Sequence, residues 1–302
     1  MTAALIIAAG RAARQGEFEP EKELGTISAI QRIAMVLQRA GIERIAVVCE
    51  EDKNQVEKLT AHMNLVFLHG HKDAEILDNV KTGLSYLQDK CSAALISRVD
   101  VPLFSVETVH QLMAANAPVC VPSHHGRMGY PILLHAEHFQ AVLSNVENGD
   151  LSDTAPAFGL PFHTVPVEDE GVLTDIQNTE SCSHLVAEHD LAELHFDLRI
   201  RLMKERAFYG PGTHQLLQLT EETGSLLDAC RLMGISYSKG RKLISKTEQQ
   251  LGYAVIESQQ GGKTGGRSNV TAQGKALMAA YSGFHTDAKQ CLQQLFHKYF
   301  TP

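Results

Sequence analysis

The stretch Ala3-Ala4-Leu5-Ile6-Ile7-Ala8-Ala9-Gly10 lies near the start of the chain and consists of seven apolar residues and a glycine. An apolar run of this length predicts a strand that is buried on both faces. Small residues directly after a strand allow backbone N–H groups to approach a phosphate closely. Glycine at this place is also common in ordinary turns, so the stretch alone leaves both interpretations open.

Beyond this stretch, short apolar runs alternate with amphipathic segments. We expect further strands at 44–49, 65–68, 93–97, 119–122 and 130–134, and helices at 27–40, 55–63 and 76–87. Repeated strand–helix–strand units with continuous apolar strands predict an α/β domain of the Rossmann-like, doubly wound type. In such a domain a parallel sheet is covered by helices on both faces.

The composition is typical of a globular protein, with 44% hydrophobic and 21% charged residues among 302. No apolar run approaches the roughly 20 residues of a membrane span, and the first run is too short for a signal peptide. The six cysteines lie far apart and form no Cys-x-x-Cys pair. We therefore expect reduced thiols in a cytoplasmic protein.

The net charge of −8 is distributed unevenly along the chain. Residues 1–193 carry 13 Lys and Arg against 27 Asp and Glu, a net of −14, whereas residues 194–302 carry 14 against 8, a net of +6. A basic final third on an acidic body predicts a nucleic-acid contact confined to that third. We place the boundary at about 190–194, which gives domains 1–192 and 193–302.

The first candidate site follows the opening strand. Gly10 and Gly16 would let the main chain approach a phosphate, and Arg14 would add a fixed cationic fork. Lys22 lies close behind, where a flexible ammonium group can reach the same phosphate.

Two carboxylates are candidates for a cation site. Asp100 follows the strand at 93–97, and ligands of open α/β sheets bind outside the carboxyl ends of the strands. Asp175 lies near the end of the predicted domain, and the pair would offer Mg²⁺ the oxygen ligands that it prefers. The simpler alternatives are a cap for a helix that starts near Ser105 and an exposed loop aspartate.

Taken together and in this order, these segments resemble the MobA/MocA-like molybdopterin nucleotidyltransferase family over about residues 1–190. The matching segments are Ile7 to Gly16, Lys22, Asn79 to Leu84, Asp100-Val101-Pro102, Gly129-Tyr130-Pro131, Gly149-Asp150 and Asp175 to Ser181.

The resemblance implies transfer of a nucleotidyl group from an NTP, CTP or GTP, to a phosphorylated molybdopterin-like acceptor, with Mg²⁺ as cofactor. It implies catalytic roles for Arg14, Lys22 and Asp100, and a metal site at Asp100 and Asp175. The implied nucleotide-binding residues are Ala8, Ala9, Gly10, Arg14, Gly16, Lys22 and Asn79. The implied acceptor-binding residues are Gly129, Pro131 and Asp150.

The chain departs from the family pattern at four positions. The loop serine is replaced by Ala12, and the arginine of the Gly-Asp element is replaced by Thr154. Gln177 and Ser181 stand where the closing motif has aspartates. Most of these changes affect the acceptor side of the family's site.

The final third predicts a different fold. A strand is expected at 196–202 and a turn at 209–212, followed by helices at 216–223, 226–233 and 237–251. Glycines at the ends of these helices, with Ser225 and Ser236 as N-caps, are typical of a helix-turn-helix. Strands at 254–258 and 269–271 enclose a Gly-rich loop, which together predict the wing of a winged helix.

The helix at 237–251 is basic and is predicted to enter DNA, with its first residues near base edges and its cations near phosphates. The expected DNA-binding residues are Ser236, Tyr237, Ser238, Lys239, Arg241, Lys242, Lys246, Lys263 and Arg267. The alternative is a solvated basic helix beside a flexible loop.

Residues 222–237 and 261–277 resemble the N-terminal domain of the ModE molybdate-responsive regulators, which is close to the LysR-type winged helix. This resemblance implies transcription regulation in molybdenum metabolism, and a homodimer formed by a helix at 278–300.

Two functions remain open at this stage. One is an active nucleotidyltransferase that also binds DNA; the other is a regulator whose altered transferase domain only senses a nucleotide or pterin. A transferase for a sugar phosphate is a third, which the ModE resemblance disfavours. The neighbouring histidines at 69 and 71, and at 124 and 125, lack the framing ligands of a metal site.

Overall fold

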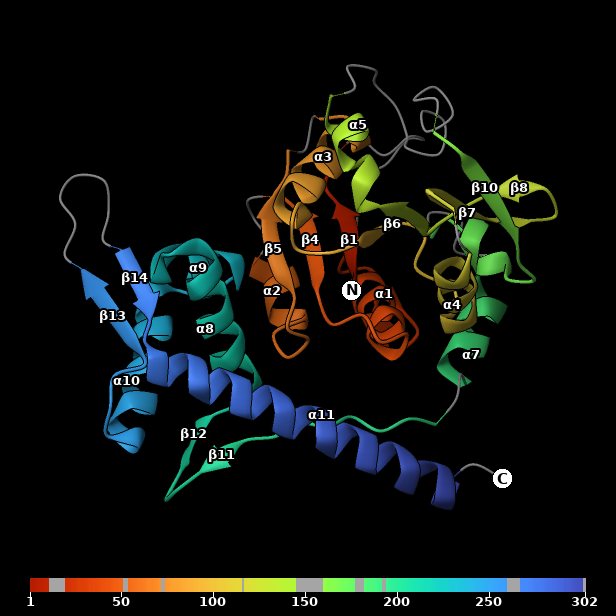
Figure 1. Ribbon diagram of the computed structural model, residues 1–302. Coiled ribbons are helices and arrows are strands. Elements are labelled where there is room, and N and C mark those ends of the chain that lie inside the picture. The colour runs from red at the N-terminus through yellow and green to blue at the C-terminus, as the bar shows by residue number, and fades with distance from the viewer. Residues whose placement is uncertain are drawn as a thin grey trace. The chain divides into compact units, whose positions relative to one another are not determined.

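The structure is a computed structural model of the 302-residue chain (Figure 1). The described residues are 1–10, 20–50, 54–71, 74–115, 117–144, 160–176, 182–191, 194–259 and 267–300. The chain divides into two compact units, Met1–Ala192 and Glu193–Pro302. Within the described ranges, the helices lack the length and apolarity that crossing a bilayer would need.

The N-terminal unit is built on one sheet with the strand order β10-β7-β9-β6-β1-β4-β5, and β8 pairs with β7. Its strands are β1 (Thr2–Ala8), β4 (Ile45–Cys49), β5 (Val66–His69), β6 (Ala93–Arg98), β7 (Val119–His124), β8 (Arg127–Met128), β9 (Ile132–His135) and β10 (Phe162–Pro166). A small separate hairpin, β2 (Glu23–Leu24) and β3 (Ile27–Ser28), comes before the first helix.

The sheet is mixed, so the prediction of a wholly parallel sheet is wrong in part. Strand β1 pairs in parallel with β4 and β6, as expected for its buried apolar sequence. Strand β9 runs antiparallel to both of its neighbours, β6 and β7. The reason is the short connection: residues 125–131 join β7 to β9, whereas a parallel crossover needs a dozen residues or more.

Helices cover the sheet from both sides. They are α1 (Ala29–Arg39), α2 (Asn54–Leu59), α3 (Ile76–Leu87), α4 (Val106–Ala114), α5 (Phe139–Ser144) and α7 (Ser183–Leu191), with 3-10 turns η1 (Ala136–His138) and η3 (Glu170–Leu173). Helix α1 begins two residues later than predicted because Ser28 and Gln31 form a capping box, in which Ser28 N donates to Gln31 Oε1 at 2.9 Å.

Alternation along β1 divides the core between the two faces of the sheet. Ala4, Ile6 and Ala8 belong to the apolar cluster that includes α1 and α4. Leu5 points to the other face, where a Cβ on Gly83 of α3 would lie 2.2 Å from Leu5 Cδ1. Glycine at position 83 is therefore required for α3 to approach the central strand so closely.

Within residues 194–259 and 267–300, the C-terminal unit forms three shorter helices, two antiparallel strand pairs and one long helix. Its elements are β11 (Leu202–Met203), β12 (Ala207–Tyr209), α8 (Pro211–Thr223), α9 (Leu226–Leu232), α10 (Tyr237–Leu251), β13 (Ile256–Gln259), β14 (Arg267–Val270) and α11 (Ala272–Phe300). Strands β13 and β14 are antiparallel.

Two local predictions for this unit are wrong. Residues 194–201 form no strand; instead Tyr281 of α11 donates a hydrogen bond to Ile200 O at 2.9 Å, and Phe196 packs on Phe296. The segment therefore lies against a helix and has no strand to pair with. The predicted turn at 209–212 is divided between Tyr209, which ends β12, the N-cap Gly210 and the first residues of α8, where Pro211 is tolerated in the first turn of the helix.

A cluster of polar aromatic groups joins β12, α8 and α11. His214 Nδ1 lies 2.9 Å from Tyr209 Oη, and His214 Nε2 lies 3.1 Å from Ser282 Oγ. Tyr281 packs edge-on against Tyr209. Burial lowers the pKa of His214 to about 4, so this imidazole is neutral in the folded protein at neutral pH.

Candidate functional site

The loop after β1 has a backbone conformation that favours glycine. Gly10 has a φ of +113°, and a Cβ at this position would lie 2.8 Å from Asn79 Nδ2. Glycine is therefore required on both conformational and steric grounds. The loop begins at the carboxyl end of β1, where ligands of α/β sheets bind.

Asn79 supports this loop from within the protein. Its side chain is fully buried, and Nδ2 donates to Ala9 O at 2.9 Å and to His71 O at 3.2 Å. Its Oδ1 accepts from His71 N at 3.1 Å. The amide thus bonds to main chain on both sides, so its described contacts hold the loop in place.

Gly70 is a residue of this region that the sequence reasoning missed. A Cβ there would lie 2.6 Å from Val48 Cγ1 and 2.9 Å from Asn79 Oδ1. Its N–H donates to Cys49 O at 2.8 Å. The available signal is a glycine two residues after the expected strand at 65–68, between the histidines at 69 and 71.

Asp100 lies just beyond β6, beside the end of β1, since Val99 N donates to Ile7 O at 3.0 Å. The residue is 2% exposed. Arg98 Nε donates to Asp100 Oδ1 at 3.0 Å, and Arg98 Nη2 pairs with Oδ2. Burial raises the pKa of the Asp100 carboxyl, Arg98 opposes that rise, and the charge of Asp175 adds to it.

The structure brings Asp175 to Asp100, although 74 residues separate them in the sequence. Ile176 N donates to Asp100 O at 2.9 Å, and the Asp175 carboxylate is close enough to raise the pKa of Asp100. Two acidic residues from distant segments therefore lie near each other at the carboxyl edge of the sheet.

Asp169 and Gly171 hold the segment that carries Asp175. Asp169 Oδ2 accepts from Ser105 N at 2.7 Å and from Thr108 Oγ1 at 2.6 Å, at the start of α4. A Cβ on Gly171 would lie 1.9 Å from Leu103 O. These contacts fix residues 169–176 against the loop that follows Asp100.

The residues predicted on the acceptor side are buried and adjoin the same segment. Gly129 N donates to Pro122 O at 3.0 Å, and a Cβ on Gly129 would lie 2.1 Å from Val172 O. Pro131 is buried next to it. Their described contacts are packing contacts that support the Asp175 segment. Asp150 lies outside the described residues.

The remaining nucleotide-side residues are only partly described. Arg14 and Gly16 lie outside the described residues. Lys22 is half-buried, and its carbonyl accepts from Ala29 N at 3.0 Å, which ties its backbone to the start of α1. This bond fixes the Lys22 backbone near α1.

A divalent cation fits this site in the kind of ligand that it offers. Asp100 and Asp175 supply hard carboxylate oxygens, and Mg²⁺ is commonly held by one or two carboxylates together with substrate phosphates. Among the described residues there is no larger group of three or more His, Cys, Asp or Glu side chains placed to hold a metal. The guanidinium of Arg98 already neutralises one of the two carboxylates.

Helix α10 of the C-terminal unit carries four basic residues, Lys239, Arg241, Lys242 and Lys246. Ser236 caps this helix, and its Oγ accepts from Lys239 N at 3.2 Å. The predicted DNA-binding residues that the structure describes are all exposed: Ser236, Tyr237, Ser238, Lys239, Arg241, Lys242, Lys246 and Arg267. Lys263 lies outside the described residues.

The inner side of α10 fixes the helix in its unit. A Cβ on Gly240 would lie 2.2 Å from Cys230 Sγ, so α10 crosses α9 at close range. Thr247 Oγ1 donates to Phe208 O at 2.8 Å, which joins α10 to β12. Because the inner face packs so closely, the basic residues remain on the outer face.

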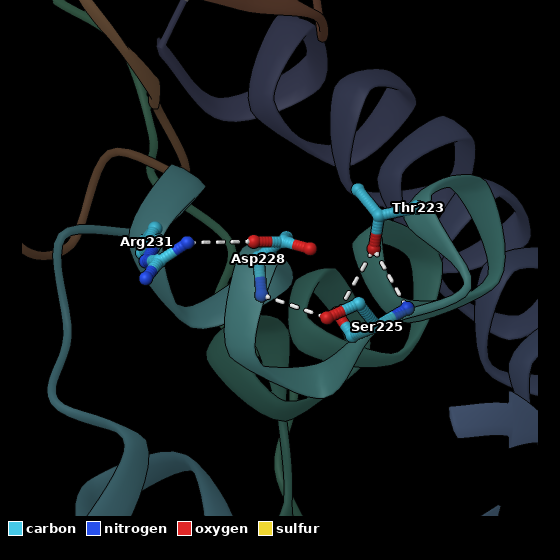
Figure 2. A network of polar contacts seen from close by, with 4 residues as sticks. All are labelled: Thr223, Ser225, Asp228 and Arg231. Carbon is cyan, nitrogen blue, oxygen red and sulfur yellow. Dashed lines mark hydrogen bonds and ion pairs between the residues drawn. The ribbon is translucent and has the colours of Figure 1, made fainter. Parts of the chain in front are cut away.

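A network of caps orders the turn before α9 (Figure 2). Ser225 Oγ accepts from Asp228 N at 3.2 Å, and Asp228 Oδ1 pairs with Arg231 Nη1 at 3.0 Å. Thr223 Oγ1 accepts from Ser225 N at 3.2 Å. In the same turn, Gly224 O accepts from Ser268 N at 2.9 Å, so the β13–β14 hairpin is attached to the helices.

The sequence matches the family of MobA-like NTP transferase domains over residues 4–174, and the chain belongs to this family. The N-terminal unit is therefore a nucleotidyltransferase domain of this type. No curated protein matches the chain.

Solved nucleotidyltransferase structures share the fold. A nucleotidyl transferase from Methanothermobacter thermautotrophicus is 16% identical with a TM-score of 0.54, covering 64% of this chain and 99% of that one. The 4-diphosphocytidyl-2C-methyl-D-erythritol synthase from Anaerococcus prevotii is 14% identical with a TM-score of 0.52, covering 63% and 98%. At such identities the likeness shows the fold alone.

Proposed function

We propose that the N-terminal unit transfers a nucleotidyl group from an NTP, CTP or GTP, to a phosphorylated molybdopterin-like acceptor, and that the C-terminal unit binds DNA as a winged helix. The observation that carries the first part is the hydrogen bond from Ile176 N to Asp100 O, which places Asp175 near Asp100 beside the end of β1. The site thus has a backbone loop for phosphates and a carboxylate pair beside it.

In this reaction an acceptor phosphate oxygen forms a bond to the α-phosphorus of the NTP. The bond between the α-phosphorus and the bridging oxygen breaks, and pyrophosphate leaves. A phosphate monoester is already an anion and needs no base, so catalysis consists of positioning and charge neutralisation. When bound, Mg²⁺ would neutralise charge on the transferring phosphates.

The residues of this chain would then act mainly by positioning. Backbone N–H groups around Gly10, held by Asn79, would bind the triphosphate, with Arg14 and Lys22 as added cations. Asp100 and Asp175 would hold the cation. Residues 169–176, anchored by Asp169 and Gly171, would keep Asp175 in place.

A second function is favoured by one observation, the pairing of Arg98 with Asp100. In this alternative the domain binds a nucleotide or pterin without transferring a group, and binding alone regulates the DNA-binding unit.

Pyrophosphate release with CTP or GTP and molybdopterin separates the two functions. A transferase releases pyrophosphate with each acceptor modified, and Asp175→Asn reduces the rate about 100-fold or more. The matched control is Glu168→Gln, which removes an exposed carboxylate just before the same segment. A wild-type protein that binds NTP but releases no pyrophosphate is a sensor.

The winged-helix proposal rests on the order of elements in the C-terminal unit. Helices α9 and α10 are joined by a turn in which Gly234 has a φ of +64°, and the β13–β14 hairpin follows. Titration of duplex DNA at increasing salt tests it: several phosphate contacts predict a steep fall in affinity, and a flat response would contradict it.

We also propose that α11 joins two copies of the chain. Phe284, Leu295 and Tyr299 are exposed on this helix. Their spacings of 11 and 4 residues place them on one face. Leu295→Glu should convert the dimer to a monomer in sedimentation experiments, and a wild-type monomer would overturn this part.

A further inference from the structure

Arg98 is the last residue of β6, and Asp100 lies two residues further on, in the turn that follows the strand. The guanidinium uses Nε and Nη2 for the two carboxylate oxygens, with Nε 3.0 Å from Oδ1. This is the two-pronged arrangement that makes arginine–carboxylate pairs strong. Both oxygens that would hold a cation therefore already accept hydrogen bonds from a cation.

The pair is also shielded and supported by Tyr130. The side chains of Arg98 and Asp100 are 11% and 3% exposed, so water screens their attraction weakly. The Arg98 guanidinium carbon lies 5.4 Å from the centre of the Tyr130 ring, a cation–π distance. Tyr130 is in turn fixed, because its N–H donates to Val172 O at 2.9 Å.

We propose that Arg98 competes with a divalent cation for Asp100 and thereby determines what the site accepts. The free metal is excluded while the guanidinium holds both carboxylate oxygens. Because the arginine fork fits a phosphate as well as a carboxylate, a metal–nucleotide complex offers Arg98 a replacement partner and brings the cation with it.

This inference rests on the proposed nucleotide site and adds its order of binding. It predicts that the protein has low affinity for metal alone, and that this affinity increases when Arg98 is removed. A buried carboxylate that loses a neutralising partner binds another cation more strongly.

The experiment titrates Mn²⁺ alone into the full chain and follows free Mn²⁺ by electron paramagnetic resonance. Arg98→Met should bind Mn²⁺ about tenfold or more tightly than the wild type, and adding Asp100→Asn should abolish the gain. Arg127→Met is the matched control, because it removes one exposed arginine from β8 of the same unit and should change nothing.

Equal Mn²⁺ affinity of wild type and Arg98→Met would overturn the proposal, as would a gain that survives Asp100→Asn. If Arg98→Met does not fold, Arg98→Lys decides, since lysine keeps the charge but loses the fork; a gain of several-fold is expected, and no gain overturns the proposal. Pyrophosphate release is measured separately, so loss of the proposed activity and loss of this competition are distinguishable.

Discussion

Asp100 and the basic residues of α10 show two ways of placing charge. Asp100 is 2% exposed and bonded to Arg98, with Asp175 brought close by a distant segment. Lys239, Arg241 and Lys242 are exposed on one helix. The first arrangement depends on many tertiary contacts, whereas the second depends only on the placement of a single helix. Function and stability should therefore be separable in the C-terminal unit and coupled in the N-terminal one.

The largest effect is expected for the triple variant Lys239→Ala, Arg241→Ala and Lys242→Ala, which should lose DNA affinity without losing stability. We expect DNA affinity to fall about 100-fold or more at moderate salt, because three phosphate or base contacts are lost. The unfolding temperature should stay nearly unchanged. Fluorescence anisotropy measures the affinity, and Lys275→Ala, which removes a lysine paired with Glu221 at 2.7 Å, is the control. Normal operator binding by the triple variant would refute the α10 assignment.

Asn79→Ala should affect stability and ligand binding together. Loss of three buried hydrogen bonds is expected to lower the free energy of unfolding by about 2–4 kcal/mol and to weaken NTP binding by releasing the Gly10 loop. Urea unfolding and calorimetric titration measure the two effects. Thr82→Ala on the same helix should change neither. Weakened binding at unchanged stability would instead mean that Asn79 contacts the nucleotide directly.

Gly240→Ala tests how much the inner side of α10, opposite its basic residues, contributes to the stability of the C-terminal unit. The added methyl meets Cys230 Sγ, so we expect a loss of about 1–3 kcal/mol. Cys230→Ala in the same chain should restore part of it, which a double-mutant cycle detects. Gly283→Ala on α11, with no atom within 4 Å of its Cβ, should instead stabilise by about 0.5–1 kcal/mol. Strict additivity of the first two changes would contradict the close helix crossing.

His214 predicts a smaller, pH-dependent effect. Its pKa is about 4 in the folded state and about 6.5 when unfolded, so below pH 6.5 the unfolded chain takes up a proton that the folded chain does not. The free energy of unfolding should be fully retained above pH 6.5 and fall by about 1–2 kcal/mol towards pH 4, allowing for partial exposure.

Tyrosine fluorescence can follow this transition, since the chain has no tryptophan and five of its seven tyrosines lie after residue 193. His214→Gln should flatten the pH dependence, and His110→Gln in the N-terminal unit should not. A wild-type unit whose stability is constant between pH 4 and 6.5 would show that this imidazole is not held neutral.

The longer strands up to β9 and the helices α1 to α3 followed from the sequence because each carries its own apolar pattern, whereas β10, α5 and α7 were not predicted. The direction of β9 could not be predicted in this way, because it depends on the length of its connection to β7 and on which strand edges are free to pair with it. The expected strand at 196–202 failed for the same reason: an alternating pattern gives a strand only where a partner strand exists.

The site shows a similar limit. Gly10 and Asp100 follow from position in the sequence, because the ends of neighbouring strands share an edge. Asp175 follows the turn η3 and was predicted from the family resemblance. Arg98 and Asn79 acquire their roles only from three-dimensional packing. A residue two positions before Asp100 carries no sequence signal for pairing with it, and a buried amide has none for the main chain that it will bind.

The hydrogen bonds of Asn79 also connect two loops of the N-terminal unit. The Asn79 amide donates hydrogen bonds to Ala9 O after β1 and to His71 O after β5, and β5 is the last strand in the sheet order. Any molecule that displaces Ala9 must therefore either move His71 as well or break the hydrogen bonds of Asn79. The rate of hydrogen exchange at the His71 N–H should therefore change when a ligand displaces the loop at Ala9.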